Sequence, residues 1–451
     1  MPFSRRDALF GGALLGGAAL VDSAARAAPP DKSGAWDTSY SGGPDDPKTP
    51  HPPGQPNVDY TPVITPNGES LPFKVVDGVK VYHLVAEEVT HEFAPGLTAK
   101  CWGYNGRVHG PTLEAVEGDR VRVYVTNRLP EPTTVHWHGV YLPNGMDGTG
   151  GLTQKVIQPG ATFKYEWTFR QSGTLMYHPH HDEMTQMALG MMGLVVVHPR
   201  NPSADAKVDR DFALLVGEWS VPIGAARPNP LAMSDFNLAT INAKCWPATA
   251  PLVVKTGERV RIRIGNLSAM DHHPIHLHGY HFKVVATDGG AIPTAGQWRE
   301  TTVLVPTGST RDIQFVADAP GDWAMHCHMT HHVMNQMGHD VPNMTGVDPK
   351  KVDAITQRAV PGYMSMGQNG MGDMADMKMP SPSNTLGMAG SAGPFDTITM
   401  GGMFTVLKVR DGITSYDDPG WYAHPAGSVA TEATADDLAR DGVSLGAAST
   451  P

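Results

Sequence analysis

The segment Gly118–Asn127, with the sequence GDRVRVYVTN, alternates apolar and polar residues. Alternation with a period of two is typical of a β-strand that has one face in a core and the other in solvent. Farther along the chain, Gly257–Asn266 (GERVRIRIGN) repeats this pattern. We therefore expect that one strand-rich unit occurs twice in this chain.

Three further pairs of motifs support the duplication, because they follow in the same order at a nearly constant offset. They are Ala99–Trp102 with Ala243–Trp246, His136–Gly139 with His276–Gly279, and His178–His180 with His326–His328. The chain has 50 glycines and 39 prolines, which favours short strands and tight turns over long helices. The sequence predicts an all-β protein whose two copies, at 76–200 and 201–410, each form a β-sandwich.

Outside the two copies, the sequence predicts little regular structure. Residues 29–75 are rich in Pro, Gly, Asp and Ser, and we interpret them as an irregular arm draped over a neighbour. An insert at about 338–399 interrupts the second copy before its last strand, which we place at Gly402–Val409. The polar tail, 411–451, is expected to be poorly ordered.

Residues 1–28 have the pattern of an export signal. Arg5 and Arg6 precede an apolar run, Ala8–Val21, and a small-residue cleavage motif follows at Ala25–Ala27. Paired arginines before such a run are typical of the twin-arginine pathway. We therefore expect a periplasmic or secreted protein.

Charge and composition exclude several classes of partner. The 451-residue chain carries a formal net charge of −11 and no basic stripe, which argues against nucleic-acid binding. No segment after the export signal is apolar enough to predict a membrane span. The three cysteines, Cys101, Cys245 and Cys327, are too few for a disulfide scaffold, and their odd number leaves at least one for another purpose.

Histidines gather in four short motifs at equivalent points of the two copies. Imidazole is the commonest metal ligand, and a His-x-His pair on a strand places both rings on one face. Four such motifs in a duplicated fold predict a metal-binding protein. The motifs are His136-Trp137-His138, His178-Pro179-His180, His273-Pro274-Ile275-His276-Leu277-His278 and His326-Cys327-His328.

The fourth motif indicates copper. Cys327, His332 and Met337 offer a thiolate, an imidazole and a thioether from one loop, and His273 adds a second imidazole. Two His, one Cys and a weak Met form the ligand set of a blue-copper electron-transfer site, whereas zinc prefers four strong ligands. Because Cys327 has a histidine on either side, an electron accepted there is one residue away from a second metal centre.

On these motifs, residues from about 80 to 340 resemble the multicopper oxidases. The resemblance implies two cupredoxin-like Greek-key sandwiches and copper as the cofactor, with one type 1 copper, one type 2 copper and a type 3 pair in each active unit. It implies that His273, Cys327, His332 and Met337 hold type 1 copper and that His136 and His276 hold type 2 copper. The type 3 pair is then held by His138, His178, His180, His278, His326 and His328.

The first copy retains no blue-copper ligands. This argues against the related copper nitrite reductases, which carry their blue copper in the first domain and lack the type 3 pair. A non-catalytic copper-binding or storage protein is the other alternative, although no expected ligand is missing. When the copies are aligned, Thr133 faces His273, Pro179 faces Cys327, Met184 faces His332 and Leu189 faces Met337.

Family members usually have three domains, and this chain resembles the two-domain, laccase-like branch. There the three-copper cluster lies between the first domain of one subunit and the second domain of the next, so the resemblance implies a homotrimer. It further implies an oxidase that takes single electrons from a small reductant, Cu(I) or a phenol, and reduces O2 to water. The residues alone leave open whether the cluster forms between subunits or within one chain.

Reduction of O2 to water consumes protons, so carboxylates near the histidines are candidate relays. Asp147, in Asn144–Gly148, matches an acidic position that the family places after its His-Trp-His-Gly motif, and we predict that it relays protons. A structural Asp in a turn before Gly is the alternative interpretation. Asp182 and Glu183, beside His180, are weaker candidates.

The insert is rich in methionine among Gly, Ser and Asp, a composition that cannot form a normal core. Thioether is a soft ligand that prefers Cu(I). We hypothesise that the insert binds Cu(I) and delivers it to the type 1 site, as in a cuprous oxidase of copper tolerance; a loop with adventitious methionines is the alternative. These methionines are Met364, Met366, Met371, Met374, Met377, Met379 and Met388.

Cys101 and Cys245 occupy equivalent positions in the two copies. We expect both to be buried thiols packed beside Trp102 and Trp246, because free cysteine behaves as a small apolar residue. A disulfide between them is the alternative, which sequence cannot decide.

Overall fold

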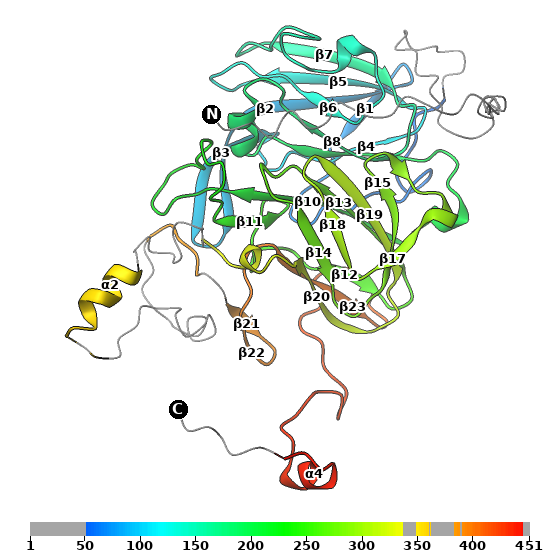
Figure 1. Ribbon diagram of the computed structural model, residues 1–451. Coiled ribbons are helices and arrows are strands. Elements are labelled where there is room, and N and C mark those ends of the chain that lie inside the picture. The colour runs from blue at the N-terminus through cyan, green and yellow to red at the C-terminus, as the bar shows by residue number, and fades with distance from the viewer. Residues whose placement is uncertain (1–50, 337–348, 360, 362–382, 388–389, 445–451) are drawn as a thin grey trace, which may run out of the picture. The chain divides into compact units, whose positions relative to one another are not determined.

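The computed structural model describes residues 51–336, 349–359, 361, 383–387, 390–444. These residues belong to one compact unit that spans 44–451. Figure 1 shows that strands dominate the fold, and among the described residues no helix is long and apolar enough to cross a membrane. Met337 and the insert methionines named above lie outside the described residues, as does the export signal.

The first domain is a sandwich of two sheets. One sheet has the strand order β1-β2-β5-β7 with β3 beside β2, and the other has the order β4-β9-β8-β6. Buried side chains from both sheets, such as Val123 and Trp137, meet in one apolar core. The elements are β1 (Phe73–Val76), β2 (Val79–Ala94), β3 (Leu97–Tyr104), β4 (Leu113–Val116), β5 (Arg120–Asn127), β6 (His136–His138), η1 (Asn144–Met146), β7 (Thr162–Thr168), β8 (Gly173–His178), α1 (Glu183–Ala188) and β9 (Gly193–His198).

The second domain repeats this plan around its own core. One sheet has the order β11-β10-β13-β19-β15-β16 with β17 beside β15, and the other has the order β12-β23-β20-β14-β18. The elements are η2 (Ala204–Ala206), β10 (Arg210–Trp219), β11 (Leu238–Ile241), β12 (Leu252–Lys255), β13 (Arg259–Asn266), β14 (His273–Leu277), β15 (Phe282–Thr287), β16 (Gly290–Ala291), η3 (Thr294–Gly296), β17 (Trp298–Glu300), β18 (Thr302–Val305), β19 (Ser309–Val316), β20 (Gly321–Cys327), η4 (Thr330–Val333) and β23 (Phe404–Arg410).

Strand pairing confirms the duplication. The repeated segments form β5 and β13, and each pairs in parallel with an earlier strand, β2 or β10, and antiparallel with a later one, β7 or β19. His136 pairs with His178 across β6 and β8, and His276 pairs with His326 across β14 and β20. The predicted all-β fold with two sandwich domains is therefore correct.

The second copy of the repeated strand differs from the prediction in its burial. In β5 buried and half-buried residues alternate, but in β13 almost every residue is buried. The polar row of β13 is covered by protein rather than solvent: Arg263 donates to the hydroxyl of Thr174 in the first domain at 2.8 Å, and Arg261 donates to Ala206 at 2.5 Å. The strand period predicted two faces, but it carried no information about which partner would cover the second one.

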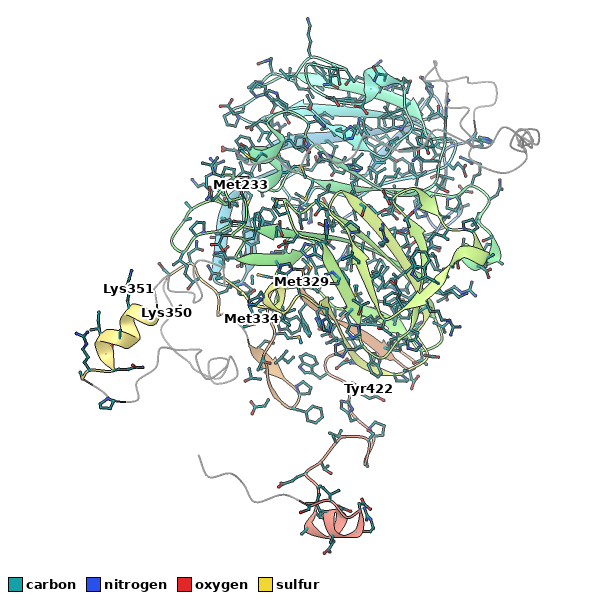
Figure 2. All side chains as sticks on the ribbon, viewed as in Figure 1. Met233, Met329, Met334, Lys350, Lys351 and Tyr422 are labelled. Atoms are coloured by element: carbon teal, nitrogen blue, oxygen red, sulfur yellow. The ribbon has the colours of Figure 1, made fainter. Side chains whose placement is uncertain are left out.

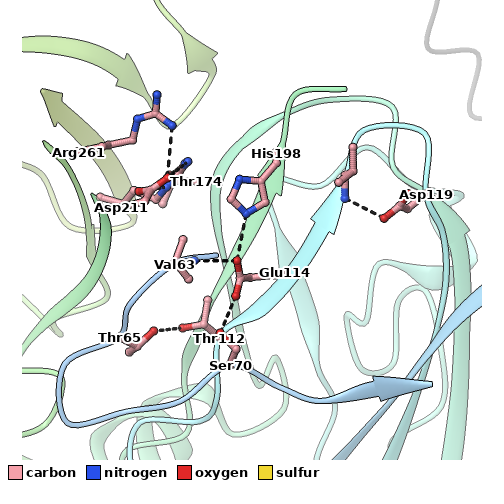
Figure 3. Close-up of polar contacts among 12 residues, drawn as sticks. Val63, Thr65, Ser70, Thr112, Glu114, Asp119, Thr174, His198, Asp211 and Arg261 are labelled. Atoms are coloured by element: carbon pink, nitrogen blue, oxygen red, sulfur yellow. Dashed lines mark hydrogen bonds and ion pairs between the residues drawn. The ribbon is translucent and has the colours of Figure 1, made fainter. Parts of the chain in front are cut away.

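Buried polar groups join the two domains, and Figure 3 shows Asp211 and Thr174 of this cluster beside Arg261. Arg263 on β13 forms ion pairs with Asp211 at 2.8 Å and with Asp312 at 3.2 Å, and all three side chains are almost fully buried. Thr174 of the first domain donates to Asp312 at 2.7 Å. Charges are retained inside a protein only when they are paired and hydrogen-bonded, so this cluster fixes one alignment of the domains.

The described part of the arm lies against the chain's own two domains. Ile64 forms a bridge to Phe212 in the second domain, and Ser70 forms one to Thr112 in the first. The amide of Val63 donates to Glu114 at 2.9 Å, and Glu114 also pairs with His198 at 3.1 Å (Figure 3). Apart from β1, the described arm contains isolated bridges in place of strands.

Cys101 and Cys245 are free, buried thiols. Both belong to one apolar cluster with Phe93 and Trp219, under the end of the β2–β3 hairpin. Burial raises the pKa of each thiol to about 12. They are therefore inert, protonated core residues without a disulfide, as expected, but the cluster around them contains Trp219 in place of Trp102 and Trp246.

The last part of the chain contains local structure that its polar composition did not predict. The insert region includes α2 (Pro349–Thr356) and a hairpin of β21 (Ser391–Gly393) and β22 (Asp396–Ile398). In the tail, Asp418 pairs with Lys408 at 2.6 Å. The short helix α4 (Ala435–Arg440) begins with a capping box at Thr434, which satisfies its first amides.

The interdomain charges generate a prediction about stability. Arg263→Leu leaves Asp312 buried without its cation and leaves Asp211 only its longer pair with Arg261, so we expect it to lower the free energy of unfolding by about 3–5 kcal/mol. Arg311→Leu breaks a partly exposed pair with Asp288 and is expected to cost less than about 1 kcal/mol. Urea unfolding of both variants checks this, and equal losses would contradict it.

Candidate metal centres

A thiol and two imidazoles converge in the second domain. His273 begins β14, Cys327 ends β20 and His332 lies in η4. Cys327 Sγ lies 3.4 Å from His332 Nδ1 and 3.8 Å from His273 Nδ1, and the two Nδ1 atoms are 3.2 Å apart. These three donor atoms surround one point, as they do in sites that bind a single metal ion.

The remaining ring nitrogens of this triad are held by the protein. Ser268 Oγ lies 2.6 Å from His273 Nε2, and Asp271 Oδ2 lies 3.2 Å from His332 Nε2. Hydrogen bonds at Nε2 fix the ring orientation and leave Nδ1 of each ring free to bind a cation. Neither partner was predicted from the sequence, although Asp271 stands two residues before His273.

Burial sets the protonation of the triad. It lowers the pKa of His273 to about 3 and raises the pKa of the Cys327 thiol to about 12. Without a cation the imidazole is neutral and the sulfur keeps its proton, so metal binding must release that proton. Two imidazoles and a thiolate in a dry pocket are the donor set that copper electron-transfer sites use.

The last strand holds the loop that carries His332. Cys327 donates its amide to Met403, and Met403 donates its amide to His332 at 2.9 Å. Gly402 has a left-handed φ of 55°, and a Cβ there would lie 2.2 Å from the carbonyl oxygen of His332. Only glycine fits at this position, because a side chain would collide with the backbone of the loop that carries His332. The segment before β23 can therefore pack against this loop.

Four histidines of the first domain form one cluster, the first-domain quartet: His136, His138, His178 and His180. His138 Nδ1 lies 3.3 Å from His178 Nε2. The Nδ1 atoms of His136 and His178 bond to the carbonyls of Asp147 at 2.8 Å and Pro179 at 2.9 Å. Each carbonyl fixes the proton on Nδ1 and leaves the lone pair of Nε2 for a metal.

The second-domain quartet consists of His276, His278, His326 and His328. His278 Nε2 lies 3.1 Å from His326 Nε2. The Nδ1 atom of His276 bonds to the carbonyl of Thr301 at 2.7 Å, and that of His326 bonds to the carbonyl of Cys327 at 2.8 Å. The carbonyl of the triad's thiol residue therefore orients an imidazole of the quartet.

The two quartets do not meet within this chain. In the described residues, the ring contacts of each quartet run only to histidines of its own domain, apart from Phe404 beside His326. The second-domain residue beside His138 is Gly308, whose Cβ position lies 3.9 Å from the His138 ring. Each quartet thus presents half of the eight-histidine cage that the sequence predicts.

In the first domain, other side chains occupy the position that corresponds to the triad. Thr133 is buried and donates to Gln186 Oε1 at 2.7 Å, and Gln186 Nε2 donates to the carbonyl of Pro132 at 2.9 Å. Leu189 is also buried, whereas Met184 is exposed. A satisfied amide and a hydroxyl replace the imidazoles and thiol, so this site holds no copper ligand set.

The predicted acidic residues lie beside the first-domain quartet. Asp147 ends η1, with Oδ1 3.4 Å from His136 Nδ1 and Oδ2 accepting from Thr149 at 2.8 Å. Glu183 lies 3.5 Å from His178 Nδ1 and 3.8 Å from His180 Nε2. Asp182 occupies the N-cap of α1 with a left-handed φ of 46°. Asp147 and Glu183 therefore both lie beside imidazoles of the quartet, and Asp182 is a turn residue.

One buried carboxyl near the triad has no signal in the sequence. Glu218 Oε1 accepts from the amides of Met270 at 2.7 Å and Asp271 at 3.2 Å. Burial, together with the neighbouring Asp271, raises the pKa of Glu218 to about 8. The carboxyl therefore carries a proton at neutral pH. Glu218 comes from β10, far from the histidine motifs in sequence, and only the fold brings it here.

Comparisons with known proteins agree with this geometry. Two family models, both described as "Multicopper oxidase", match residues 85–202 and 223–346. Laccase-18 of Oryza sativa subsp. japonica is 31% identical over 246 residues, which cover 49% of this chain and 39% of the relative. Copper resistance protein A of Escherichia coli is 29% identical over 237 residues, 41% of this chain and 38% of the relative. The chain spans about half the length, or less, of these curated relatives.

Solved structures show the same likeness. The blue copper oxidase of Nitrosomonas europaea matches with a TM-score of 0.53 and 26% identity, over 72% of this chain and 85% of that one. The multicopper oxidase mgLAC matches with a TM-score of 0.54 and 27% identity, over 75% of this chain and 90% of that one.

The buried imidazoles generate a prediction about pH. Burial lowers the pKa of His91 to about 4 and of His109, His178 and His273 to about 3, against an ordinary value of 6.5. The unfolded chain takes up protons below pH 6.5 and the folded chain does not. The metal-free protein should therefore lose stability as the pH falls from 6.5 toward 4, by up to about 1.4 kcal/mol per pH unit for each histidine.

His109→Phe isolates one of these contributions. We expect the variant to show a shallower dependence of unfolding free energy on pH, by up to about 1.4 kcal/mol per unit, because one proton fewer is taken up on unfolding. Urea unfolding of metal-free protein between pH 4 and 7 measures the slope. Parallel curves for wild type and variant would disprove the assignment.

Proposed function

Because the chain belongs to the multicopper oxidase family, we propose that it takes single electrons from a small reductant at a type 1 copper and uses four of them to reduce O2 to water at a three-copper cluster. The observation that carries this proposal is the position of Cys327. Its sulfur belongs to the triad, and its carbonyl holds His326 of the second-domain quartet. One peptide unit thus links two metal-binding centres.

The residues present fit the copper ions that this function requires. His273, Cys327 and His332 would hold type 1 copper, with Met337, outside the described residues, as the proposed weak ligand. His136 and His276 would hold type 2 copper. The type 3 pair would be held by His138, His178, His180, His278, His326 and His328, the assignment that the family motifs imply.

The chain's own groups prepare these sites before any cation binds. Backbone carbonyls hold four of the quartet imidazoles by Nδ1, and Ser268 and Asp271 hold the triad imidazoles by Nε2. The rings are thereby oriented, so little reorganisation accompanies metal binding or electron transfer.

We propose that a second copy of the chain completes the cage. Each quartet presents its imidazoles without a counterpart from the other domain of the same chain. A head-to-tail contact between the first domain of one copy and the second domain of the next joins the two halves, and such a contact forms a ring where the rotation between copies closes. A homotrimer with the cluster at each interface accounts for the separation of the quartets.

Asp147 is our candidate for the proton relay. Its carboxylate is half-buried, lies beside His136 and is oriented by Thr149. Its backbone carbonyl, which holds the ring of His136, is independent of the side chain. One residue therefore positions a ligand and can carry a proton toward the site where O2 is reduced.

Substitution of Asp147 separates these two roles. Asp147→Asn keeps the carbonyl that holds His136 but removes the titratable group, so we expect O2 turnover to fall by roughly tenfold or more, in the range of general acid–base effects. Copper content and anaerobic bleaching of the type 1 absorption band should stay as in the wild type. Asp396→Asn, in an exposed hairpin, is the matched control. Unchanged turnover would leave Asp147 with a structural role only.

Copper tolerance is a second candidate role, with Cu(I) as the reductant. Met329 and Met334 flank η4 next to the triad (Figure 2), and Met329 is exposed. The methionine-rich insert, outside the described residues, follows this loop in sequence. The match to copper resistance protein A of Escherichia coli adds support. The twin-arginine pattern of residues 1–28 is consistent with a periplasmic or secreted protein.

Deletion of residues 370–380 tests the role of the insert. If its thioethers deliver Cu(I), O2 uptake driven by Cu(I) should fall at least roughly tenfold, because the soft ligands are lost. Uptake driven by a phenol should stay near the wild-type rate. Equal losses with both reductants would remove the reason to assign Cu(I) delivery to the insert.

The proposed function is tested by an absorption spectrum of copper-loaded protein and by its O2 uptake. A thiolate–copper bond at Cys327 predicts an intense absorption band at about 600 nm, and Cys327→Ser should abolish this band. Wild-type protein should consume O2 with ferrocyanide or a phenol as reductant. A protein that binds copper but consumes no O2 would be the storage alternative.

A further inference from the structure

A cavity of about 330 Å³ is lined by the linker that joins the two domains, by the start of β8 and by strands of the second domain. The linker contributes η2, and the second domain contributes residues of β13, β15 and β19. Among the described residues, none of the candidate metal ligands belongs to this lining. The volume lies at the lower end of the range of about 300–1,000 Å³ that is usual for small-molecule sites. The cavity is therefore distinct from the metal centres and large enough for a small organic molecule.

One buried cation in these walls has an unused hydrogen-bond donor. Arg261, on β13, is only 9% exposed, and its Nε has no hydrogen-bond partner among the described residues. Its Nη1 contacts Asp211 at 3.4 Å (Figure 3), and its Nη2 donates to the carbonyl of Ala206 at 2.5 Å. A buried donor on a charged group costs more than a neutral one when it lacks an acceptor. An oxygen acceptor in the cavity would therefore stabilise the protein.

The charges around Arg261 favour an anionic oxygen. Arg263, on the same strand, contacts Asp211 at 2.8 Å and Asp312 at 3.2 Å, whereas Arg261 has only the longer contact with Asp211. Burial and the positive charge of Arg263 lower the pKa of Arg261, but a guanidinium stays charged at neutral pH. Asp205 also lines the cavity, but it is exposed, and solvent screens its charge. Arg261 is therefore a buried cation without a carboxylate of its own.

The duplication of the domains shows which group Arg261 lacks. Arg122 occupies the same position in the repeated segment of the first domain. Its partner across β5 and β7 is Glu166, and Arg122 Nε donates to this carboxylate at 2.7 Å. The residue opposite Arg261 on β19 is Gln314, whose Nε2 donates to the carbonyl of Asp205 at 3.0 Å. The second domain thus carries a neutral amide where the first domain has the carboxylate that satisfies this arginine.

The rest of the lining suits a compact apolar body. Val197 and Ala286 are buried, and both line the cavity with Ile292. Hydroxyl groups of Ser172 and Thr294 belong to the same lining. Small-molecule sites combine apolar walls of this kind with a few polar groups that fix the orientation of the ligand. The walls therefore favour an organic acid over a small, fully hydrated anion.

We propose that this cavity binds a small aliphatic carboxylate. Its carboxylate accepts from Arg261 Nε, in the role that Glu166 has toward Arg122, and its alkyl body packs against Val197 and Ile292. The bound anion completes the buried ion cluster that fixes the alignment of the two domains. Because the lining contains no candidate metal ligand, the site is independent of the proposed function.

Binding of 3-methylbutanoate to the full, copper-loaded chain, measured by calorimetry, tests the site. Gln314→Glu supplies the missing carboxylate from the chain itself, and Ala291→Trp fills the cavity from an exposed position on β16. We expect each to weaken binding by roughly tenfold to a hundredfold, the range for a hydrogen bond to a charged group. The matched controls are Gln158→Glu and Ala295→Trp, at exposed positions outside the lining, and both should bind as the wild type.

Two further measurements sharpen the test. 3-Methylbutanamide has the same body without the charge and should bind at least roughly tenfold more weakly than the acid. The acid should raise the unfolding temperature of the wild type, because it binds only the folded chain, and should leave that of Gln314→Glu nearly unchanged.

No binding of 3-methylbutanoate to the wild type at millimolar concentration would mean that water alone fills the cavity, and it would overturn the proposal. Wild-type affinity in both Gln314→Glu and Ala291→Trp would place the anion elsewhere, for example at a copper ion, and would also overturn it. Equal losses in the controls would have the same consequence. Unfolding temperatures identify a variant that has lost its fold, and either substitution alone suffices for the test.

Discussion

The pairing of β14 with β20 is the constraint on which both metal centres depend. Its register sets His276 opposite His326 and Ile275 opposite Cys327. Because successive side chains of a strand point to opposite faces, Cys327 enters the buried triad while His326 joins the quartet on the other side. A slip of one residue would exchange the two faces and destroy both sites at once. The amide of Cys327 donates to the carbonyl of Met403. This hydrogen bond and the buried core of the second domain hold the register against such a slip.

Burial then gives the sites their chemistry. The imidazoles of His178 and His273 are neutral and the thiol of Cys327 is protonated, so the metal-free protein keeps its cation sites without buried charge. Charges that are buried elsewhere, above all Arg263 between Asp211 and Asp312, are paired and fix how the domains meet. Domain alignment and the geometry of the candidate metal centres are therefore parts of one packing arrangement.

The sequence predicted features that are local or repeated, and it missed features that depend on distant contacts. The period of two in β5 and β13 and the duplicated motifs predicted the two sandwiches, and the motif histidines do gather into the triad and two quartets. The burial of the second face of β13, the replacement of ligands by Gln186 and the approach of Glu218 to Asp271 all depend on segments far apart in the chain. Arg261 repeats Arg122 in the sequence, and only its unpartnered Nε in a cavity distinguishes it. Such contacts carry no periodic signal that a single sequence displays.

The central claim is that a cage competent for O2 reduction is built from the first domain of one copy and the second domain of another. Co-expression of His178→Ala chains with His326→Ala chains tests it, because each variant alone has one defective half of every cage. If the cage lies between chains, random assembly into a ring restores about a quarter of the cages, and O2 uptake should return to about that fraction of the wild-type rate. Mixed assemblies that contain both chains and remain as inactive as either variant alone would contradict the account and place the cage within one chain.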